Sequence, residues 1–204
     1  MNEQLLKKVQ NCNIKNIMQQ KGYVFFEKGN YNLNLIGIRA ERPGNRNNDT
    51  FDDLFMVIYN NGKGEPAKLI IPITTIPGLS YMKNPSNSKG TAILKPGQYR
   101  GVWKIDFHNG KYSALCQRGD KFVVYRDNNR DNILDFNEAT TDYGYFGINF
   151  HKAGENSQII GANSAGCKVC QRSADFEEVM LLSEKSREIY GNSFTYTLLN
   201  ESDL

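Results

Sequence analysis

A chain of 204 residues in which 39% of the side chains are hydrophobic and 23% are charged can bury the core of one globular domain. The formal net charge of only +3 and the scattered basic residues argue against nucleic acid as a partner. No apolar run approaches the roughly 20 residues that span a bilayer, so membrane insertion is not expected either. Composition leaves the oligomeric state open.

The N-terminal segment has apolar residues at roughly helical spacing and ends at a helix-stopping glycine, Gly22. This pattern predicts an amphipathic helix as a first unit over residues 1–22. The remaining residues, 23–204, are expected to form a single β-rich domain. No repeat and no low-complexity linker divides them.

Short apolar runs between glycine and asparagine turns follow from residue 23 onward, and this texture is typical of strands. The runs predict strands over residues 23–26, 32–35, 54–59, 68–71, 91–94, 102–107, 112–116, 122–125, 146–151 and 194–199. One further helix is expected over residues 175–190, with Asp175 as its N-cap, Glu178 completing a capping box and Gly191 as the C′ residue. The predicted fold class is mainly β, α+β, with one N-terminal and one C-terminal helix.

The segment 127–138 has oxygen-bearing side chains at the alternating positions that an EF-hand loop uses to bind Ca²⁺. These candidate ligands are Asp127, Asn129, Asp131, Asp135 and Glu138. The residues before the segment are strand-like, so the site would be a structural calcium loop without paired helices. An Asx-rich turn between strands and a calcium-dependent binding module are the alternatives.

The chemistry of the chain is expected at its cysteines, which are too sparse for a disulfide framework. His151 ends a predicted strand, and a glycine-containing return leads to the sequence Ser164-Ala165-Gly166-Cys167. A thiol attacks acyl carbon as a thiolate and needs a neighbouring base. We therefore predict that Cys167 is a nucleophile with His151 as its base, and that the N–H groups of Gly166 and Cys167 face the developing oxyanion.

Two other interpretations concern the remaining cysteine and histidine. Cys167 and Cys170 form a C-x-x-C pair, which is also found in redox sites and in halves of zinc sites, but no second such pair or close histidine pair accompanies it. The only other histidine, His108, lies in a His-Asn-Gly turn and is predicted to be solvated.

The spacing of these residues resembles the catalytic domain of the L,D-transpeptidase superfamily, whose signature is a histidine, a variable stretch and then Ser-His-Gly-Cys. Residues 146–151 with residues 164–167 are similar to a phage-associated branch thought to act on peptidoglycan peptides, and residues 90–99 are similar to the substrate-side strand and turn of that family. The resemblance covers roughly residues 75–185. It implies an L,D-transpeptidase-like mixed β-sheet domain that needs no cofactor for catalysis. Cys167 would be the nucleophile, His151 the general base and Ser164 a residue that shapes the loop or supports the base.

The reaction implied by this resemblance is cysteine-dependent acyl transfer on peptidoglycan stem peptides, by hydrolysis or by cross-linking. Candidate substrate contacts are Lys168, Arg172, Tyr145 and Trp103. Ala165 and Val169 stand where the family has a second histidine and, in many members, an arginine. These departures motivate the alternative of a non-catalytic wall-binding or virion structural protein.

The N-terminus lacks the apolar region of a secretory signal peptide. We therefore expect synthesis in the cytoplasm. Association with a virion, or release to the cell wall by another route, would bring the protein to a wall substrate.

Overall fold

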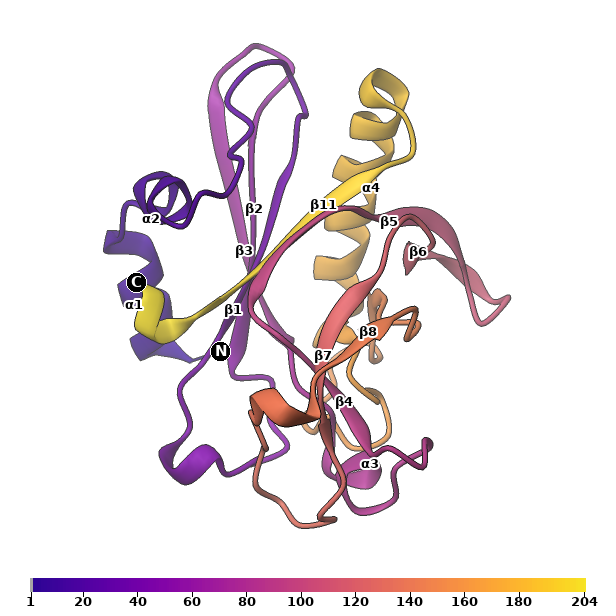
Figure 1. The fold of residues 1–204 in the computed structure, drawn as a ribbon. Helices are drawn as coiled ribbons and strands as arrows, with labels where there is room; N and C mark the ends of the chain where they lie inside the picture. The colour runs from indigo at the N-terminus through magenta and orange to yellow at the C-terminus, as the bar shows by residue number, and fades with distance from the viewer. Residues whose placement is uncertain (1) are drawn as a thin grey trace.

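A computed structural model describes residues 2–204 as a mixed α+β fold that is mainly β (Figure 1). Eight strands form a closed barrel in the order β1-β11-β5-β6-β9-β10-β3-β2. Their bounds are β1 (Asn34–Arg39), β2 (Asp53–Asn60), β3 (Pro66–Thr74), β5 (Gly97–His108), β6 (Tyr112–Gln117), β9 (Phe150–Lys152), β10 (Lys168–Cys170) and β11 (Phe194–Asn200). The predicted fold class is confirmed at this level.

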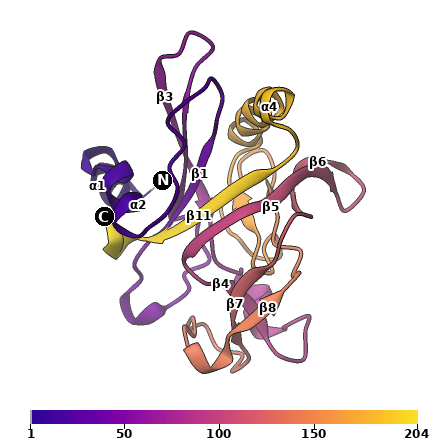
Figure 2. The ribbon, with the colours of Figure 1, turned by 45° about the horizontal axis from the view of Figure 1, so that its top comes forward.

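Most neighbouring strands of the barrel are antiparallel, but β11 runs parallel to β1 and β10 runs parallel to β9. The last strand closes the barrel because β11 lies between β1 and β5. A second, three-stranded sheet in the order β4-β7-β8 lies beside the barrel (Figure 2). It consists of β4 (Thr91–Leu94), β7 (Phe122–Asp127) and β8 (Asp142–Gly144).

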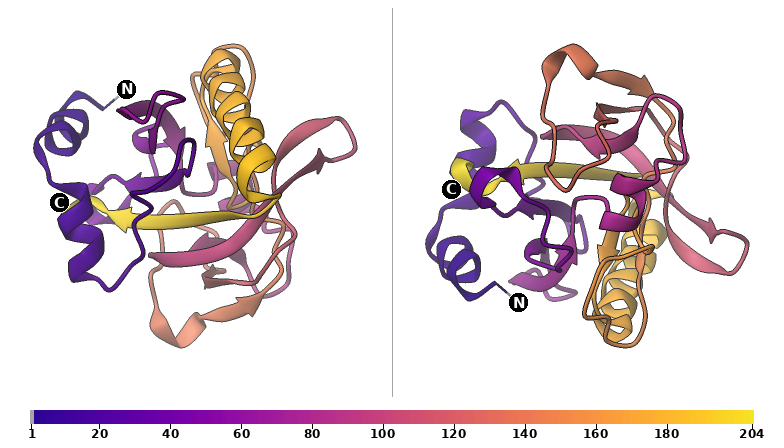
Figure 3. Two further views of the ribbon diagram at one scale, coloured as in Figure 1. Left: turned by 90° about the horizontal axis from the view of Figure 1, so that it is seen from above. Right: turned by 90° about the horizontal axis from the view of Figure 1, so that it is seen from below.

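The helices lie on two sides of the barrel. The four α-helices are α1 (Glu3–Asn11), α2 (Ile14–Gln20), α3 (Leu79–Lys83) and α4 (Ser173–Tyr190), and three 3₁₀ turns are η1 (Pro43–Asn45), η2 (Glu138–Thr140) and η3 (Glu201–Asp203). The views along the vertical axis of Figure 1 show α1 and α2 on one side of the strands and α4 on another (Figure 3). Among residues 2–204, no helix combines the length and the apolar character needed to cross a bilayer.

Strands β1 and β2 bury both of their faces, because one face meets the barrel core and the other meets α1 and α2. Leu35 and Phe55 belong to the cluster that fills the barrel and contacts α4. Ile36 and Leu54 belong to the cluster that includes Leu5 on α1. A strand that is covered on both sides is expected to be apolar along its length, and all six residues of β1 are buried.

The N-terminal segment differs from the prediction, since it forms two helices where one was expected. Cys12 is extended, with φ −77° and ψ 154°, and this ends α1. Asn13 then begins α2, because its side chain accepts a hydrogen bond from the N–H of Asn16. A capping residue inside a periodic apolar pattern therefore divides the segment. The division into units at residue 22 stays a prediction.

The strand predicted over residues 23–26 is wrong, because side-chain amides take the hydrogen bonds that a neighbouring strand would make. The N–H of Val24 donates to Oε1 of Gln98 at 2.9 Å, and the N–H of Phe26 donates to Oδ1 of Asn34 at 2.7 Å. The predicted strand at residues 146–151 is also too long, since β9 begins only at Phe150.

The C-terminal helix and its glycine end agree with the prediction, but its N-terminal cap does not. α4 begins at Ser173, two residues before the predicted cap, and Arg172 precedes it without a side-chain cap. Asp175 instead pairs with Arg172 at 2.6 Å. Gly191 follows the helix with φ 83°, a backbone angle that favours glycine.

Candidate active site

The parallel pair β9 and β10 brings the two predicted catalytic residues to one face of the barrel wall. Val169 is paired with His151, and Lys168 with Phe150. Side chains alternate between the two faces of a strand, so Cys167, two residues before Val169, lies on the same face as His151. Phe150 belongs to the barrel core, which identifies the face with Cys167 and His151 as the outer one.

Cys167 is a partly exposed residue whose thiol is held by backbone groups. Its Sγ accepts from the N–H of Asn149 at 3.5 Å and donates to the carbonyl of Gly147 at 3.4 Å. No hydrogen bond joins Cys167 to a histidine within residues 2–204. Catalytic hydrogen bonds are often long or misaligned before substrate binds.

His151 is buried, and its neighbours define which ring nitrogen has the proton. The Nδ1 atom lies 3.0 Å from the carbonyl oxygen of Lys152. A carbonyl can only accept, so Nδ1 is the N–H donor and Nε2 has the free lone pair in the neutral ring. His151 is therefore in the tautomer that a base acting through Nε2 requires.

A second histidine, which the sequence reading placed in a solvated turn, lies directly against the first. The rings of His108 and His151 are stacked with centroids 4.2 Å apart and planes 17° from parallel. The Nδ2 atom of Asn149 lies 3.1 Å from Nδ1 of His108, and Oδ1 of Asn149 accepts from the N–H of Gln117 at 2.8 Å. The prediction for His108 was wrong because β6 folds back along β5 and pairs with β9, which brings the end of β5 to the site.

We call Cys167, His151, His108 and Asn149 the histidine cluster. Asn149 connects its members, since its backbone N–H contacts the thiol and its side chain contacts His108. Local sequence gave no signal for Asn149 or His108. Only the strand order, with β6 between β5 and β9, would have indicated them.

The ionisation of the histidine cluster favours neutral groups. Burial, helped by the neighbouring His108, lowers the pKa of His151 to about 4. Burial raises the pKa of the Cys167 thiol, opposed by the Asn149 N–H and the charge of Lys168. Both shifts disfavour a preformed thiolate–imidazolium pair. A proton would therefore leave the sulfur only as the sulfur attacks.

The loop before Cys167 is organised by a buried hydroxyl. The Oγ atom of Ser164 lies 3.1 and 3.0 Å from the carbonyl oxygens of Ile76 and Cys167, which share its single proton, and it accepts from the N–H of Gly166 at 3.1 Å. Gly166 has φ 123°, and a Cβ atom there would lie 2.4 Å from the carbonyl oxygen of Ala92. This position therefore needs glycine.

The Ser164 contact corrects one part of the predicted oxyanion site. The N–H of Gly166 is bound to Ser164 in this structure and does not face open space. The N–H of Cys167 makes no hydrogen bond within residues 2–204, so it is the donor of the predicted pair that is free for a ligand.

The four predicted substrate contacts fall into two groups. Trp103 is fully buried, stacks on Tyr196 at 4.4 Å and donates to the carbonyl of Ile148 at 2.8 Å. Lys168 is also fully buried, with its Nζ on the carbonyls of Thr75 and Gly166 at 2.7 and 2.9 Å. These two predictions are wrong, because neither side chain can reach a substrate.

Arg172 and Tyr145 are exposed, as a substrate contact requires. The guanidinium of Arg172 is held by Asp175 through two hydrogen bonds, at 2.6 and 3.0 Å. Tyr145 is 59% exposed and lies two residues before Gly147, whose carbonyl contacts the thiol. Their roles in binding stay predictions.

The other cysteine of the C-x-x-C pair lies in the barrel core. Cys170 is buried, and burial raises its pKa to about 12. Cys167 and Cys170 are both free thiols, and they point to opposite faces of β10 because they are three residues apart. A disulfide between them would require β10 to move.

The predicted calcium loop is held by its own hydrogen bonds. Asp127 Oδ2 accepts from the N–H of Asp135 at 3.2 Å, and Asn129 donates to Asp135 at 2.9 Å. Asp131 Oδ1 accepts from the N–H of Ile133 at 2.7 Å. Within residues 2–204, no group of three or more histidine, cysteine or acidic side chains is close enough to hold a metal ion.

Glu138, the predicted last ligand of that loop, pairs elsewhere. It contacts Lys95 at 2.5 Å and Tyr125 at 3.1 Å. Asp127 is buried, and its Oδ1 has no hydrogen-bond partner within residues 2–204. Burial and the charges of Asp135 and Asp131 raise the pKa of Asp127 to about 6. A cation at Asp127 therefore stays a prediction.

Comparisons of the chain with protein-family models, with curated proteins and with solved structures found no significant match.

Proposed function

We propose that this chain is a cysteine-dependent acyl-transfer enzyme in which Cys167 is the nucleophile and His151 the general base. The observation that supports this most is the parallel pairing of β9 and β10, which gives both side chains one face. The partial exposure of Cys167 and the free Nε2 lone pair of His151 add to it.

The first half of the reaction breaks the acyl bond of the substrate. The Sγ atom of Cys167 attacks the carbonyl carbon while its proton moves to Nε2 of His151. The oxyanion that forms takes a hydrogen bond from the N–H of Cys167. Collapse breaks the carbon–nitrogen bond, and the leaving amine takes the proton from Nε2. A thioester on Cys167 remains.

The second half releases the acyl group. Water, or the amine of a second peptide, attacks the thioester carbon and gives a proton to Nε2 of His151. The carbon–sulfur bond then breaks, and the sulfur takes that proton. Water gives hydrolysis, and an amine gives a cross-link.

Peptidoglycan stem peptides are the substrate class that we propose, on the resemblance of residues 146–151 and 164–167 to L,D-transpeptidase catalytic domains. The exposed residues next to the thiol agree with a polymeric substrate. Ala165 and Gly147 are exposed beside the thiol, and this supports the approach of a peptide from solvent. The reaction needs no cofactor.

The decisive test compares two cysteines of the same molecule. Cys12 is partly exposed like Cys167, and burial raises the pKa of both thiols, but Cys12 lies at the end of α1, where its Sγ donates to the carbonyl of Val9. We expect a β-lactam acylating agent, such as a carbapenem, to form a thioester on Cys167 and not on Cys12, as read by peptide mass. The His151→Ala variant should not form that adduct, while an unchanged far-ultraviolet circular dichroism spectrum shows that it is folded. Equal modification of both cysteines would contradict the proposal.

A non-catalytic wall-binding protein is the second candidate. Two observations favour it: Gly166 N–H is bound to Ser164, and no hydrogen bond joins Cys167 to His151 within residues 2–204. Incubation with muropeptides separates the candidates. Products of changed mass support the enzyme, whereas pull-down with intact wall material but unchanged muropeptides supports the binding protein.

A further inference from the structure

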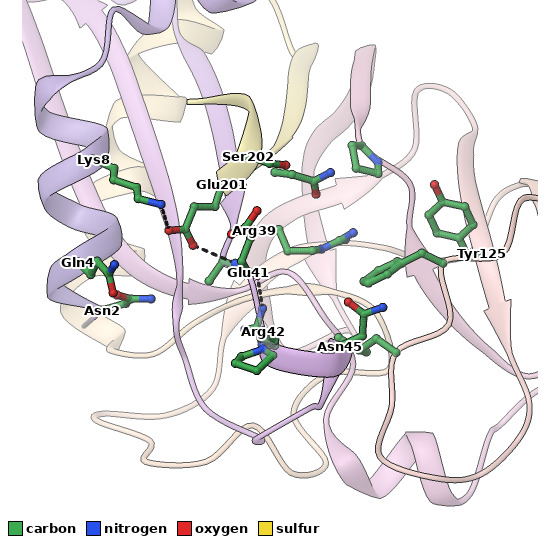
Figure 4. A pocket seen from close by; sticks show the side chains of 16 residues that line it. Asn2, Gln4, Lys8, Arg39, Glu41, Arg42, Asn45, Tyr125, Glu201 and Ser202 are labelled. Carbon is green, nitrogen blue, oxygen red and sulfur yellow. Dashed lines mark hydrogen bonds and ion pairs between the residues drawn. The ribbon is translucent and has the colours of Figure 1, made fainter.

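A cavity of about 710 Å³ opens between α1, η3 and the small sheet, and neither Cys167 nor His151 lines it. Cavities of this volume are in the range that holds small organic ligands. Its wall is apolar and aromatic on one side, with Pro96, Tyr125, Leu134 and Phe136. Figure 4 shows the guanidinium of Arg39 pointing from the middle of the cavity toward Tyr125.

Arg39 is fixed by three hydrogen bonds that leave one end of its guanidinium free. Nε donates to Thr75 Oγ1 at 3.2 Å, and Nη2 donates to the carbonyls of Thr75 and Leu94 at 3.4 and 2.7 Å. An arginine has five N–H donors, so the two on Nη1 have no partner within residues 2–204. The guanidinium also lies over the Phe136 ring, 5.3 Å from its centroid.

Other buried basic side chains lie close to Arg39, because Lys168 donates to the same Thr75 carbonyl as Arg39 Nη2. Arg39, Arg42 and Lys168 form a group with Asp53, which we call the arginine cluster. Arg42 Nη2 pairs with Asp53 at 3.0 Å, and the two side chains are only 5% and 0% exposed. Lys168 is fully buried, and burial together with the charge of Arg39 lowers its pKa to about 7.

Asp53 is the carboxylate of this group: it pairs directly with Arg42, and Thr75 connects it to Arg39 and Lys168. It already accepts the N–H of Ala40 and the N–H and hydroxyl of Thr75, at 2.9, 2.6 and 2.8 Å. Buried charges are stable when they are paired. The arginine cluster therefore has more cationic than anionic groups, and the surplus lies beside the cavity.

The acidic residues of the cavity do not neutralise that surplus. Glu201 is bound by Lys8 at 2.7 Å and by the N–H of Glu41 at 2.9 Å (Figure 4). Glu41 is exposed at the mouth. Neither carboxylate makes a hydrogen bond to Arg39 within residues 2–204.

We propose that this cavity binds a small monocarboxylate with an aromatic or apolar body. The carboxylate would accept the two N–H groups of Arg39 Nη1, and the body would lie against Tyr125 and Phe136. One free pair of N–H groups suits a single carboxylate better than a phosphate dianion, which needs more donors and would approach Glu41. This site is independent of the reaction at Cys167.

The test is a nuclear magnetic resonance titration of the whole chain with three probes: 3-phenylpropanoate, its neutral amide and inorganic phosphate. We expect the carboxylate to bind, with shift changes at Arg39, Tyr125 and Phe136. The amide should bind at least about tenfold more weakly, because the charge-assisted hydrogen bonds are lost. Phosphate should also bind more weakly, since it makes no contact with the aromatic wall.

Three variants sharpen the titration. Arg39→Lys keeps the charge but loses the planar pair of donors, and Phe136→Ala removes the wall at a half-buried position. Each of these two variants should weaken the binding of the carboxylate about tenfold. Arg118→Lys is the matched control, because Arg118 pairs with Asp106 on the surface at 2.7 Å and does not line the cavity. It should leave binding unchanged.

The proposal is overturned by any of three results: no carboxylate binding at millimolar concentration, equal binding of the amide, or shift changes that map away from the cavity. Phosphate binding as tight as that of the carboxylate would also overturn the assigned ligand class. If Arg39→Lys does not fold, the probe comparison on the unchanged chain and the Phe136→Ala variant still decide. Labelling of Cys167 is unaffected by either outcome.

Discussion

The histidine cluster and the arginine cluster include adjacent residues of the chain but differ in charge. Cys167 and Lys168 are neighbours in the chain but point to opposite faces of the barrel wall. The side of Cys167 holds neutral imidazoles, a thiol and an amide. The side of Lys168 holds guanidiniums and a carboxylate. A group that must gain and lose protons stays close to neutral, whereas a group that binds an anion keeps a fixed charge.

The largest expected effect is on the rate of acyl transfer at the neutral cluster. His151→Gln removes the proposed base but keeps a polar side chain of similar length. Product formation from muropeptides should fall by about 10²- to 10⁴-fold, the usual contribution of a general base. His108→Gln is the matched comparison, since His108 contacts His151 but is not proposed to touch the reacting atoms. If His108→Gln lowers the rate of product formation more than His151→Gln does, the roles of the two histidines are reversed.

The charged cluster should respond in stability instead. Asp53→Asn leaves the arginine cluster without its shared carboxylate, and unfolding in urea should show a loss of about 3–5 kcal/mol. Although burial alone would raise it, Arg42 and the N–H groups of Ala40 and Thr75 hold the pKa of Asp53 below its usual range. Asp52→Asn, one residue away and half-buried, should change stability by less than about 1 kcal/mol. Equal losses in the free energy of unfolding from the two variants would show that the buried pairing does not stabilise the fold more than the carboxylate of Asp52 does.

The pH dependence of stability sharpens the contrast further. His151 has a pKa of about 4 in the folded chain, below its ordinary value of 6.5. The unfolded chain therefore binds this proton more readily, so stability is full above pH 6.5 and falls as the pH drops toward 4. The loss should reach roughly 3 kcal/mol at pH 4 and should be largely absent in His151→Gln. A wild-type curve that is flat over this window would mean that His151 is not buried as described.

The smallest effect concerns Asp127, a buried carboxylate outside both clusters. Its pKa of about 6 lies above its usual range, so the ionised form destabilises the fold above pH 6. Asp127→Asn should raise the free energy of unfolding by about 1–3 kcal/mol at pH 7.5 without calcium. Addition of Ca²⁺ should raise the melting temperature of the wild type but not of the variant. If Ca²⁺ stabilises neither protein, the segment 127–138 is an Asx-rich turn.

Local pattern was sufficient where the residues' own β propensity or backbone preference decided the structure. The strand predicted over residues 91–94 agrees with β4, and Gly191 ends α4 as expected. The same reasoning failed at residues 23–26, where the β-forming pattern is intact but Gln98 and Asn34 take the backbone groups. Those amides are 74 and 8 residues away from their partners, and only the first of these distances is beyond any local window.

The site was predicted in part for the same reason. His151 and Cys167 were proposed as a pair from their spacing, and their common face depends on β9 and β10 being parallel. Nothing in a strand's own sequence specifies the direction of its partner. Lys168 was misassigned because a lysine usually lies at the surface, and Trp103 because an aromatic side chain can line a groove as well as a core. Here the barrel encloses both. His108 was missed because its position beside His151 depends on the pairing of β6 with β9, which local sequence does not reveal.

The pairing of Val169 with His151 ties the two clusters to one alignment of the chain. A slip of β10 by a single residue would turn Lys168 outward to the imidazoles and Cys167 inward to the guanidiniums. We expect both proposed functions to be lost in that exchange, because an ammonium cannot replace the proposed nucleophile and a buried thiol cannot balance the charge of Asp53. Deletions or insertions between Gly166 and Val169 should therefore eliminate both binding of an anion and reaction at sulfur together, although the two sites open in different places on the molecule.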